Sequence, residues 1–273
     1  MTLPISVATW NIHKGFSQFN RRMMVHELRE RLRALNADIV FLQEVQGLHL
    51  KHAERHEHWP TEPQHEFLAA DVWHSSAYGQ NMVYDHGHHG NAILSRFPIL
   101  HQHNQDVTHL RFERRGLLHC AVELPPLDQP LHCVCVHLSL FARSRRWQLD
   151  ALATYIEAMV PANAPLLIAG DFNDWRNRAD ELLAQRLGLD EIFSTAGRRA
   201  SQHTTQQKAA RPSRSYPAAL PLFRLDRIYQ RGLTVTAAHR HAGLPWSTIS
   251  DHAALSATLH IAVPESVLPR VVS

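Results

Sequence analysis

The 273-residue sequence has few cysteines and no long apolar segment. No stretch reaches the roughly 18 apolar residues that a membrane-spanning helix needs, and the first residues lack a basic region followed by an apolar run. We therefore expect neither an export signal nor a membrane anchor. The three cysteines, Cys120, Cys133 and Cys135, lie among Val, Ala and Leu, which predicts buried free thiols and a cytoplasmic location.

The sequence also has little excess charge of either sign. The 28 Lys and Arg residues nearly balance the 25 Asp and Glu residues, leaving a net charge of +3 and a pI near 8.9. This mild basicity favours phosphate-bearing partners but is not a strong nucleic-acid signature. With 44% hydrophobic and 19% charged residues, the chain is neither disordered nor fibrous.

We expect a single domain over residues 1–273, with its core at about 6–260 and a peripheral tail at 261–273. Nothing in the sequence indicates an obligate protein partner.

Short apolar runs that end in polar residues recur along the chain. Predicted strands of this kind cover residues 5–10, 39–42, 92–94, 133–136 and 166–169. Apolar residues at spacings of three and four predict amphipathic helices over residues 21–35 and 145–159. The alternation of strands and helices indicates the α/β class, with polar side chains delivered to strand ends.

Two further segments have biased composition. Residues 49–65 are rich in histidine, which predicts a solvated loop, with a metal-buffering tract as the alternative. Residues 198–214 hold five Lys or Arg residues and no Asp or Glu, which predicts an exposed, basic, mobile loop.

The polar residues at the strand ends suit the hydrolysis of a phosphate ester. That reaction requires neutralisation of phosphoryl charge and activation of water, and Mg²⁺ takes oxygen ligands. Glu44, Asp171 and Asp251 lie at the ends of predicted strands and can supply these oxygen ligands. Asp171 and Asn173 would project toward one locus if the chain there is extended. The alternative for these two residues is an Asx-rich turn.

Two histidines also lie at the ends of predicted strands. His137 ends a strand and His252 follows Asp251, so either imidazole can donate a proton or stabilise negative charge. The alternative for each is a satisfied or surface histidine. Asp226 would either orient such an imidazole or pair with a neighbouring arginine, Arg224 or Arg227.

Seven motifs occur in an order that resembles the endonuclease/exonuclease/phosphatase superfamily. They are Thr9-Trp10-Asn11-Ile12-His13, Leu42-Gln43-Glu44, Gly90-Asn91-Ala92-Ile93-Leu94-Ser95-Arg96, Val136-His137-Leu138, Gly170-Asp171-Phe172-Asn173, Arg224-Leu225-Asp226-Arg227-Ile228 and Ser250-Asp251-His252. Each motif is weak alone, but their order over about residues 6–260 is specific.

The resemblance implies a four-layer α/β/β/α sandwich of the DNase I-like type, with two face-to-face mixed β-sheets flanked by helices. It implies a metal site at which Glu44 is the principal Mg²⁺ ligand, Asn11 a helper, and Asp251 a direct or water-mediated contact. Mn²⁺ is a possible substitute for Mg²⁺.

The resemblance also assigns catalytic roles. Asp171 would align the attacking water, and Asn173 would bind a phosphoryl oxygen. His252 would contact the phosphate, with Asp226 as its orienting carboxylate. His137 stands where nuclease-like, sphingomyelinase-like and phosphatase-like members carry histidine, which disfavours an abasic-site repair role.

Three more residues are predicted to bind substrate, namely Asn91, Arg96 and Arg143. His13 stands where the repair branch often has an acidic residue, which favours one-metal chemistry. The residues of these motifs most resemble those of a bacterial subgroup whose substrate is unassigned.

The sequence therefore predicts a Mg²⁺-dependent phosphodiesterase. The basic loop 198–214, with Arg143, Arg145 and Arg146, favours nucleic acid as the substrate. A phospholipid headgroup would use the same arginines, with Trp73, Trp175 or Trp246 as an apolar wall and without stable membrane insertion. The alternatives are a small-molecule phosphomonoesterase and a catalytically silent phosphate-binding scaffold.

Overall fold

The computed structural model describes residues 2–194 and 213–263. The strands are β1 (Thr2–Asn11), β2 (Ile39–His49), β3 (Ser75–Tyr84), β4 (Gly87–Ser95), β5 (Ile99–Asp106), β6 (Gly116–Val122), β7 (Leu131–His137), β8 (Leu166–Asp171), β9 (Asp190–Glu191), β10 (Asp226–Arg231), β11 (Leu233–His241) and β12 (Ala254–Ala262). The helices are α1 (Val25–Leu35), α2 (Leu50–Arg55), α3 (Gln64–Ala69), α4 (Ala142–Met159) and α5 (Arg178–Leu187), with 3-10 turns at His13–Gly15, Gln18–Asn20 and Trp246–Thr248.

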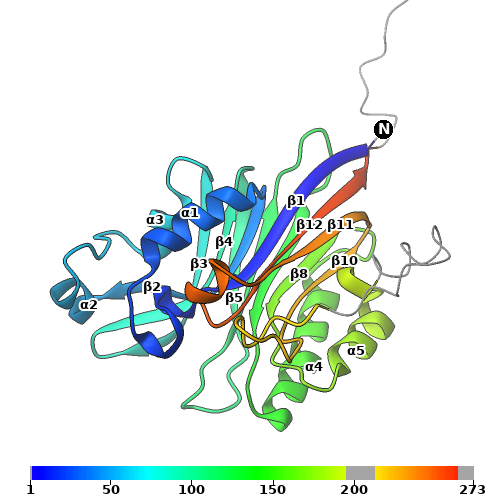
Figure 1. The fold of residues 1–273 in the computed structure, drawn as a ribbon. Helices are drawn as coiled ribbons and strands as arrows, with labels where there is room; N and C mark the ends of the chain where they lie inside the picture. The colour runs from blue at the N-terminus through cyan, green and yellow to red at the C-terminus, as the bar shows by residue number, and fades with distance from the viewer. Residues whose placement is uncertain (1, 195–212, 264–273) are drawn as a thin grey trace, which may run out of the picture.

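The strands form two six-stranded mixed sheets. The first has the order β11-β12-β1-β2-β4-β3 and the second the order β5-β6-β7-β8-β10-β9. Only β1–β2 and β7–β8 are parallel pairs in the described part of the chain. Figure 1 shows the sheets with α1 and α3 on one side of the molecule and α4 and α5 on the other. The predicted four-layer sandwich is confirmed.

The alternation of side chains along β1 explains why both of its faces are buried. Ile5 and Val7 point into the core between the two sheets, whereas Ala8 and Trp10 point to the outer core beneath α1 and α3. The second sheet buries its outer face under α4 and α5 in the same way. A strand covered on both faces reads as a continuous apolar run, as residues 5–10 do.

The predicted helices are correct in kind but not at their N-terminal ends. The first helix begins at Val25 instead of residue 21, because Ser17 closes a loop through its backbone and side-chain hydrogen bonds with Arg22. The second begins at Ala142, three residues before the predicted start. Both end where expected, at Leu35 and Met159.

The histidine-rich segment 49–65 is not the predicted solvated loop. It contains α2 and the start of α3, and the rings of His52, His56 and Trp59 pack around Phe16. A groove of about 560 Å³ lies beside these rings and is lined by Lys14, among others.

The remaining expectations from the sequence have mixed outcomes. Cys120, Cys133 and Cys135 are buried free thiols, as predicted. Most of the basic loop 198–214 and most of the tail 261–273 lie outside the described residues. Within the described part of the chain, no helix combines the length and apolarity that crossing a membrane requires.

A buried arginine ties the second sheet to the loop after β8. Arg227 on β10 is fully buried, and its guanidinium donates to Asp180 Oδ1 at 2.7 Å and to the Asp174 carbonyl at 2.7 Å. Asp174 in turn accepts the backbone N–H of Ala179 at 2.8 Å and so caps the start of α5. The hydrogen bonds and ion pairs of Arg227 therefore fix the loop that follows β8.

Replacing Arg227 should unfold the protein more easily than replacing a surface arginine. Arg227→Met leaves the buried Asp174 without its cation and removes one of the two arginines paired with Asp180, so we expect a loss of about 3–5 kcal/mol in the free energy of unfolding by urea. The control is Arg186→Met, whose ion pair with Glu157 lies at the solvent-exposed surface, so the free energy of unfolding should change much less. Equal losses in the two variants would contradict this account.

Candidate active site

Asp171 lies at the centre of a buried polar cluster where the two sheets meet. It is the last residue of β8, and it is nearly inaccessible to solvent. Gly170 before it has φ +146°, and a Cβ there would lie 2.0 Å from the Val136 carbonyl oxygen of β7. Only glycine therefore allows the approach that brings Asp171 beside the end of β7.

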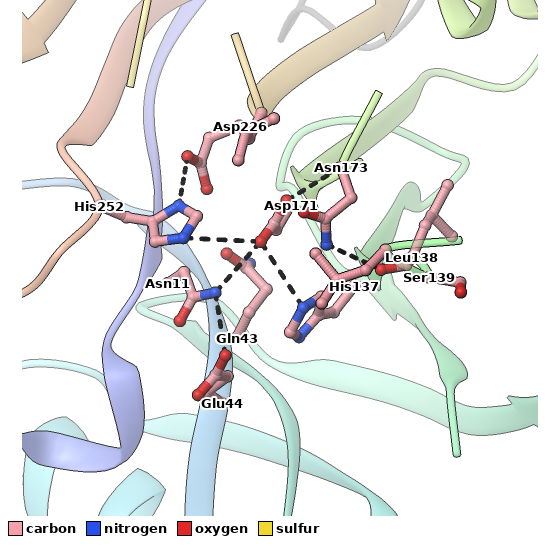
Figure 2. A network of polar contacts seen from close by, with 12 residues as sticks. Asn11, Gln43, Glu44, His137, Leu138, Ser139, Asp171, Asn173, Asp226 and His252 are labelled. Carbon is pink, nitrogen blue, oxygen red and sulfur yellow. Dashed lines mark hydrogen bonds and ion pairs between the residues drawn. The ribbon is translucent and has the colours of Figure 1, made fainter. Parts of the chain in front are cut away.

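One carboxylate oxygen of Asp171 faces three polar side chains (Figure 2). Its Oδ2 accepts a hydrogen bond from Asn11 Nδ2 at 3.2 Å, and lies 3.6 Å from His137 Nε2 and 3.8 Å from His252 Nε2. Burial, reinforced by Asp226, raises the pKa of Asp171 to about 6, although the His252 imidazole opposes the shift. The carboxylate is thus a proton acceptor close to neutral pH.

His252 is held as a cation by its neighbours. Its Nδ1 lies 2.8 Å from Asp226 Oδ2, a buried hydrogen bond that orients the ring. Burial alone would lower the pKa of His252, but Asp226, Asp171 and Asp251 outweigh it and raise the pKa to about 10. Arg224 and Arg227 pair with other acids. Of the two alternatives for Asp226, the geometry therefore favours orienting His252 over pairing with a neighbouring arginine.

The loop that carries His252 is fastened to the end of β1. The Trp10 indole N–H donates to the His252 carbonyl at 2.8 Å, and Ser250 Oγ donates to the Asn11 carbonyl at 2.7 Å. The ring of Tyr216 packs on the His252 imidazole, with centroids 4.9 Å apart. The position of His252 is therefore set by three separate segments.

Glu44 adopts an unusual backbone conformation. It does not follow a strand, as predicted from the sequence, but lies inside β2 at a bulge between Leu42 and Val45, with φ +54°. Its carboxylate lies 3.5 Å from Asn11 Nδ2 and 3.4 Å from Lys14 Nζ. The bulge turns Glu44 out of the regular alternation toward the cluster, at a backbone cost typical of functional sites.

The pKa of Glu44 is shifted in the opposite direction to that of Asp171. Burial alone would raise it, but the charge of Lys14 holds the pKa of Glu44 well below its usual range. The carboxylate therefore stays ionised across the physiological range.

Asn173 also has a left-handed backbone, with φ +48°. Its N–H donates to Asp171 Oδ1 at 2.9 Å, and its Nδ2 donates to the Leu138 carbonyl at 2.9 Å. The Asx turn that was the alternative reading is present, and it is this turn that places Asn173 beside Asp171.

His137 is a buried, neutral imidazole. Burial and the charge of Arg115 hold the pKa of His137 well below its usual range, although Glu44 opposes the shift. Because it lies beside Asp171 and carries no charge, it can donate or accept a hydrogen bond without repelling His252.

The donor set at Glu44 fits a divalent cation such as Mg²⁺. Glu44 and Asp251 offer carboxylate oxygens, and Asp251 Oδ1 is buried without a hydrogen-bond partner among the described residues. His13 Nδ1 lies 3.4 Å from that oxygen. Oxygen donors of this kind, held near Asn11, are what Mg²⁺ or Mn²⁺ prefers.

A second group of potential ligands is less suitable. Asp171, Asp226 and His252 offer atoms within 4.8 Å of one another. However, the raised pKa of His252 means that a metal ion at this group would have to displace a proton from the imidazole. We therefore place the candidate metal locus at Glu44.

The three predicted substrate-binding residues lie in different places: Asn91 is opposite the bulge that holds Glu44, Arg96 is away from the cluster, and Arg143 is on the surface. Asn91 is buried in β4 and donates to the carbonyls of Gly116 and Cys135 in the other sheet. Arg96 pairs with Asp38 at 3.3 Å and follows the end of β4 that lies away from Glu44. Arg143 is exposed in the first turn of α4.

The structure therefore favours a role for Asn91 in joining the sheets and leaves Arg96 outside the cluster. The reason is the antiparallel pairing of β2 with β4, which carries the two ends of the Asn91-to-Arg96 motif to different places.

A known protein family matches most of the chain. A family model described as "Endonuclease/Exonuclease/phosphatase family" matches residues 8–252. The chain belongs to the endonuclease/exonuclease/phosphatase family. This places it among hydrolases of phosphoester bonds, a family whose members generally use a divalent metal ion.

Relatives of this family protein include the uncharacterized protein YbhP of Escherichia coli K12. The two are 45% identical over 255 residues, which cover 93% of this chain and 96% of YbhP. The YbhP of Shigella flexneri matches with the same identity and coverage.

Solved structures share the fold. An endonuclease/exonuclease/phosphatase of Bacteroides vulgatus superposes with a TM-score of 0.71 at 16% identity, covering 95% of this chain and 100% of that one. D. rerio TDP2 complexed with a single-strand DNA product has a TM-score of 0.65 at 21% identity, covering 94% and 98%. At these identities the likeness concerns the fold.

Three residues beside the cluster were not singled out from the sequence, namely Lys14, Arg115 and Tyr216. Lys14 adjoins the first motif, so its position was a usable signal. Arg115 and Tyr216 lie outside every motif and reach the cluster only through the folding of distant segments.

The charge of His252 is testable in the protein freed of metal with EDTA. Asp226 contributes most to raising its pKa, so the imidazole should remain protonated at pH 7.5 in the wild-type protein. In Asp226→Asn, burial should dominate and lower the pKa, leaving the ring neutral at that pH. Two-dimensional NMR of the imidazole nitrogens reports both states, and identical titrations would contradict the assignment.

Proposed function

We propose that this family member is a divalent-metal-dependent phosphodiesterase that uses one water to cleave a P–O bond. The observation that carries the proposal is the buried contact of Asp171 with His252 and Asn11, beside the ionised Glu44. Water supplies the oxygen that bonds to phosphorus, and its protons end on Asp171 and on the leaving oxygen.

Asp171 is suited to orient the attacking water and accept its proton. A general base is most effective with a pKa near the working pH, and the pKa of Asp171 is raised to about 6. The Asn11 amide and the backbone N–H of Asn173 hold its two oxygens, so the carboxylate is fixed before substrate binds.

His252 supplies positive charge to a non-bridging phosphoryl oxygen. As a cation fixed by Asp226, it stabilises the charge that grows on the phosphoryl group in the transition state. Asn173 can donate the second hydrogen of its amide group to the same phosphoryl group, since the first is held by Leu138.

Glu44 and Asp251, with Asn11, would hold Mg²⁺ or Mn²⁺. When bound there, the ion neutralises negative charge on the phosphate and makes the leaving oxygen a better leaving group. Lys14 adds a cation near the same carboxylate and is available to the substrate phosphate.

The proposed substrate is a phosphodiester of nucleic acid or of a phospholipid headgroup, and the proposed location is the cytoplasm, where the three buried thiols stay reduced. Arg143 and Arg146, exposed on α4, support an anionic substrate of either kind.

Loss of the proton acceptor should abolish turnover without unfolding the protein. We expect Asp171→Asn to lower kcat for bis(p-nitrophenyl) phosphate with Mg²⁺ by about 10²–10⁴-fold. The matched control is Asp150→Asn on the surface of α4, which should retain wild-type kcat. Circular dichroism checks that both variants fold, and near-wild-type turnover by Asp171→Asn would refute the assignment.

The metal locus can be separated from the base by titrating Mg²⁺. Glu44→Gln removes an ionised ligand, so the Mg²⁺ concentration needed for half-maximal rate should rise at least about tenfold. Glu54→Gln, an exposed change on α2, serves as the control. An unchanged Mg²⁺ requirement in Glu44→Gln would place the ion elsewhere.

A panel with p-nitrophenyl phosphate distinguishes monoester from diester hydrolysis. Preference for the monoester would replace the diesterase proposal with a phosphomonoesterase. No hydrolysis of any ester with Mg²⁺ or Mn²⁺ would leave a phosphate-binding scaffold.

A further inference from the structure

Large apolar side chains are exposed on the loops beside the cluster. Eight of the fifteen exposed large hydrophobic residues in the described chain come from four short stretches: Phe112, Leu140, Phe141, Trp147, Trp175, Leu220, Leu222 and Phe223. Phe112 and Leu220 are each 68% exposed. Apolar groups concentrated in this way mark an interaction surface, whereas scattered ones do not.

These side chains form a connected surface, which we call the apolar rim. The rings of Phe112 and Phe141 are in contact at 5.9 Å, and those of Trp175 and Phe223 at 4.6 Å. Leu140, next to Phe141, lines the same groove of about 890 Å³ as Trp175. The groove thus joins the two aromatic pairs.

The rim adjoins the candidate active site. Leu140 is three residues after His137, and Trp175 is two residues after Asn173. Phe223 pairs across an isolated bridge with Tyr216, whose ring packs on His252. A molecule bound to the rim therefore presents its nearest atoms to the cluster.

The backbone beneath the rim is firmly held, so the exposure is not a sign of a loose loop. Arg145 donates to the carbonyls of Ser139 and Leu140 at 2.8 and 3.1 Å, and Gln148 Oε1 accepts from Ser139 N at 2.7 Å. The Glu113 carboxylate accepts from Ser139 Oγ and from Leu140 N. Fixed loops that point apolar side chains outward are suited to binding.

The charge around the rim is positive. Exposed arginines flank it in the same segments: Arg111, Arg114, Arg143, Arg146, Arg176 and Arg178. In residues 2–194 and 213–263, none of these guanidinium groups has an ion pair. Acids of the same segments are engaged elsewhere: Glu113 pairs with Arg115, and Asp174 with Arg227.

We propose that the apolar rim docks on an anionic lipid bilayer and that the substrate is a phospholipid phosphodiester presented from that surface. Phe, Trp and Leu side chains enter the boundary between headgroups and acyl chains, while arginines bind lipid phosphates. Three of the eight rim residues, Leu140, Leu220 and Leu222, have no ring on which a base can stack, which favours acyl chains over nucleic acid. Docking on the bilayer does not depend on the proposed function; only the identity of the substrate rests on it.

The test measures vesicle binding by full-length protein carrying Asp171→Asn, in EDTA, so that lipid is not consumed. Vesicles of phosphatidylcholine with about one-third phosphatidylglycerol should sediment the protein, and binding should weaken with salt. Adding Phe112→Ser and Phe141→Ser should lower the partition coefficient at least about tenfold. Adding Leu100→Ser and Met159→Ser, exposed apolar residues outside the rim, should not.

Each outcome decides the proposal, with thermal melts confirming that the variants fold. Equal binding by the two double-serine variants overturns it, as does a failure of the parent protein to bind these vesicles. Binding of a single-stranded oligonucleotide instead, lost with Phe112→Ser and Phe141→Ser, also overturns it and assigns the rim to nucleic acid. Wild-type hydrolysis of bis(p-nitrophenyl) phosphate, measured in parallel, shows separately whether the proposed phosphodiesterase activity holds.

Discussion

The site depends on one buried carboxylate that is shared by both sheets. Asp171 ends a strand of the second sheet, yet its Oδ2 is bonded to Asn11, which ends the central strand of the first. A carboxylate out of contact with water requires hydrogen bonds or cations, and here the partners come from both sheets and from the loop of His252. The apolar core between the sheets sets their separation, so the packing that stabilises the fold also sets the distances at which the catalytic groups meet.

Much of this arrangement is legible in the sequence, because strands that end in polar residues at a common edge bring those residues together. Asn11, His137 and Asp171 illustrate it, because each is the last residue of an apolar strand with a clear boundary. The structure brings Glu44 and Asn173 to the cluster. The Asx turn at Asn173 was one of the two alternatives that the sequence offered, but the bulge at Glu44 was not foreseen, since it depends on the neighbouring strand and leaves no local pattern. Arg96 shows the opposite failure. It belongs to a motif of the family, but β4 runs away from the cluster and places Arg96 beside Asp38. The direction of a strand relative to its neighbours cannot be inferred from a single short motif.

The loop after β7 serves chemistry and exposure at once. Its backbone carbonyl at Leu138 holds Asn173, and the next two carbonyls are held by Arg145, whose side chain is buried between α4 and this loop. With every nearby backbone group engaged inward, the side chains of Leu140 and Phe141 are left to point outward. The hydrogen bonds of this loop therefore position the Asn173 amide and also support the apolar rim. A surface built on such a support can bind without disturbing the catalytic geometry, which a mobile loop could not ensure.

The division of roles within the cluster follows from electrostatics more than from motif membership. Two carboxylates lie on either side of Asn11, and their surroundings move their pKa values apart. Lys14 depresses the pKa of Glu44 despite its burial, whereas burial raises that of Asp171 to about 6. The imidazoles divide likewise, because Asp226 keeps His252 charged while burial and Arg115 keep His137 neutral. A permanently ionised carboxylate suits a cation, one that titrates near neutrality suits a proton from water, and a fixed imidazolium suits a phosphoryl oxygen. Exchanging any two of these environments would leave the same residue types in place and remove the basis for catalysis.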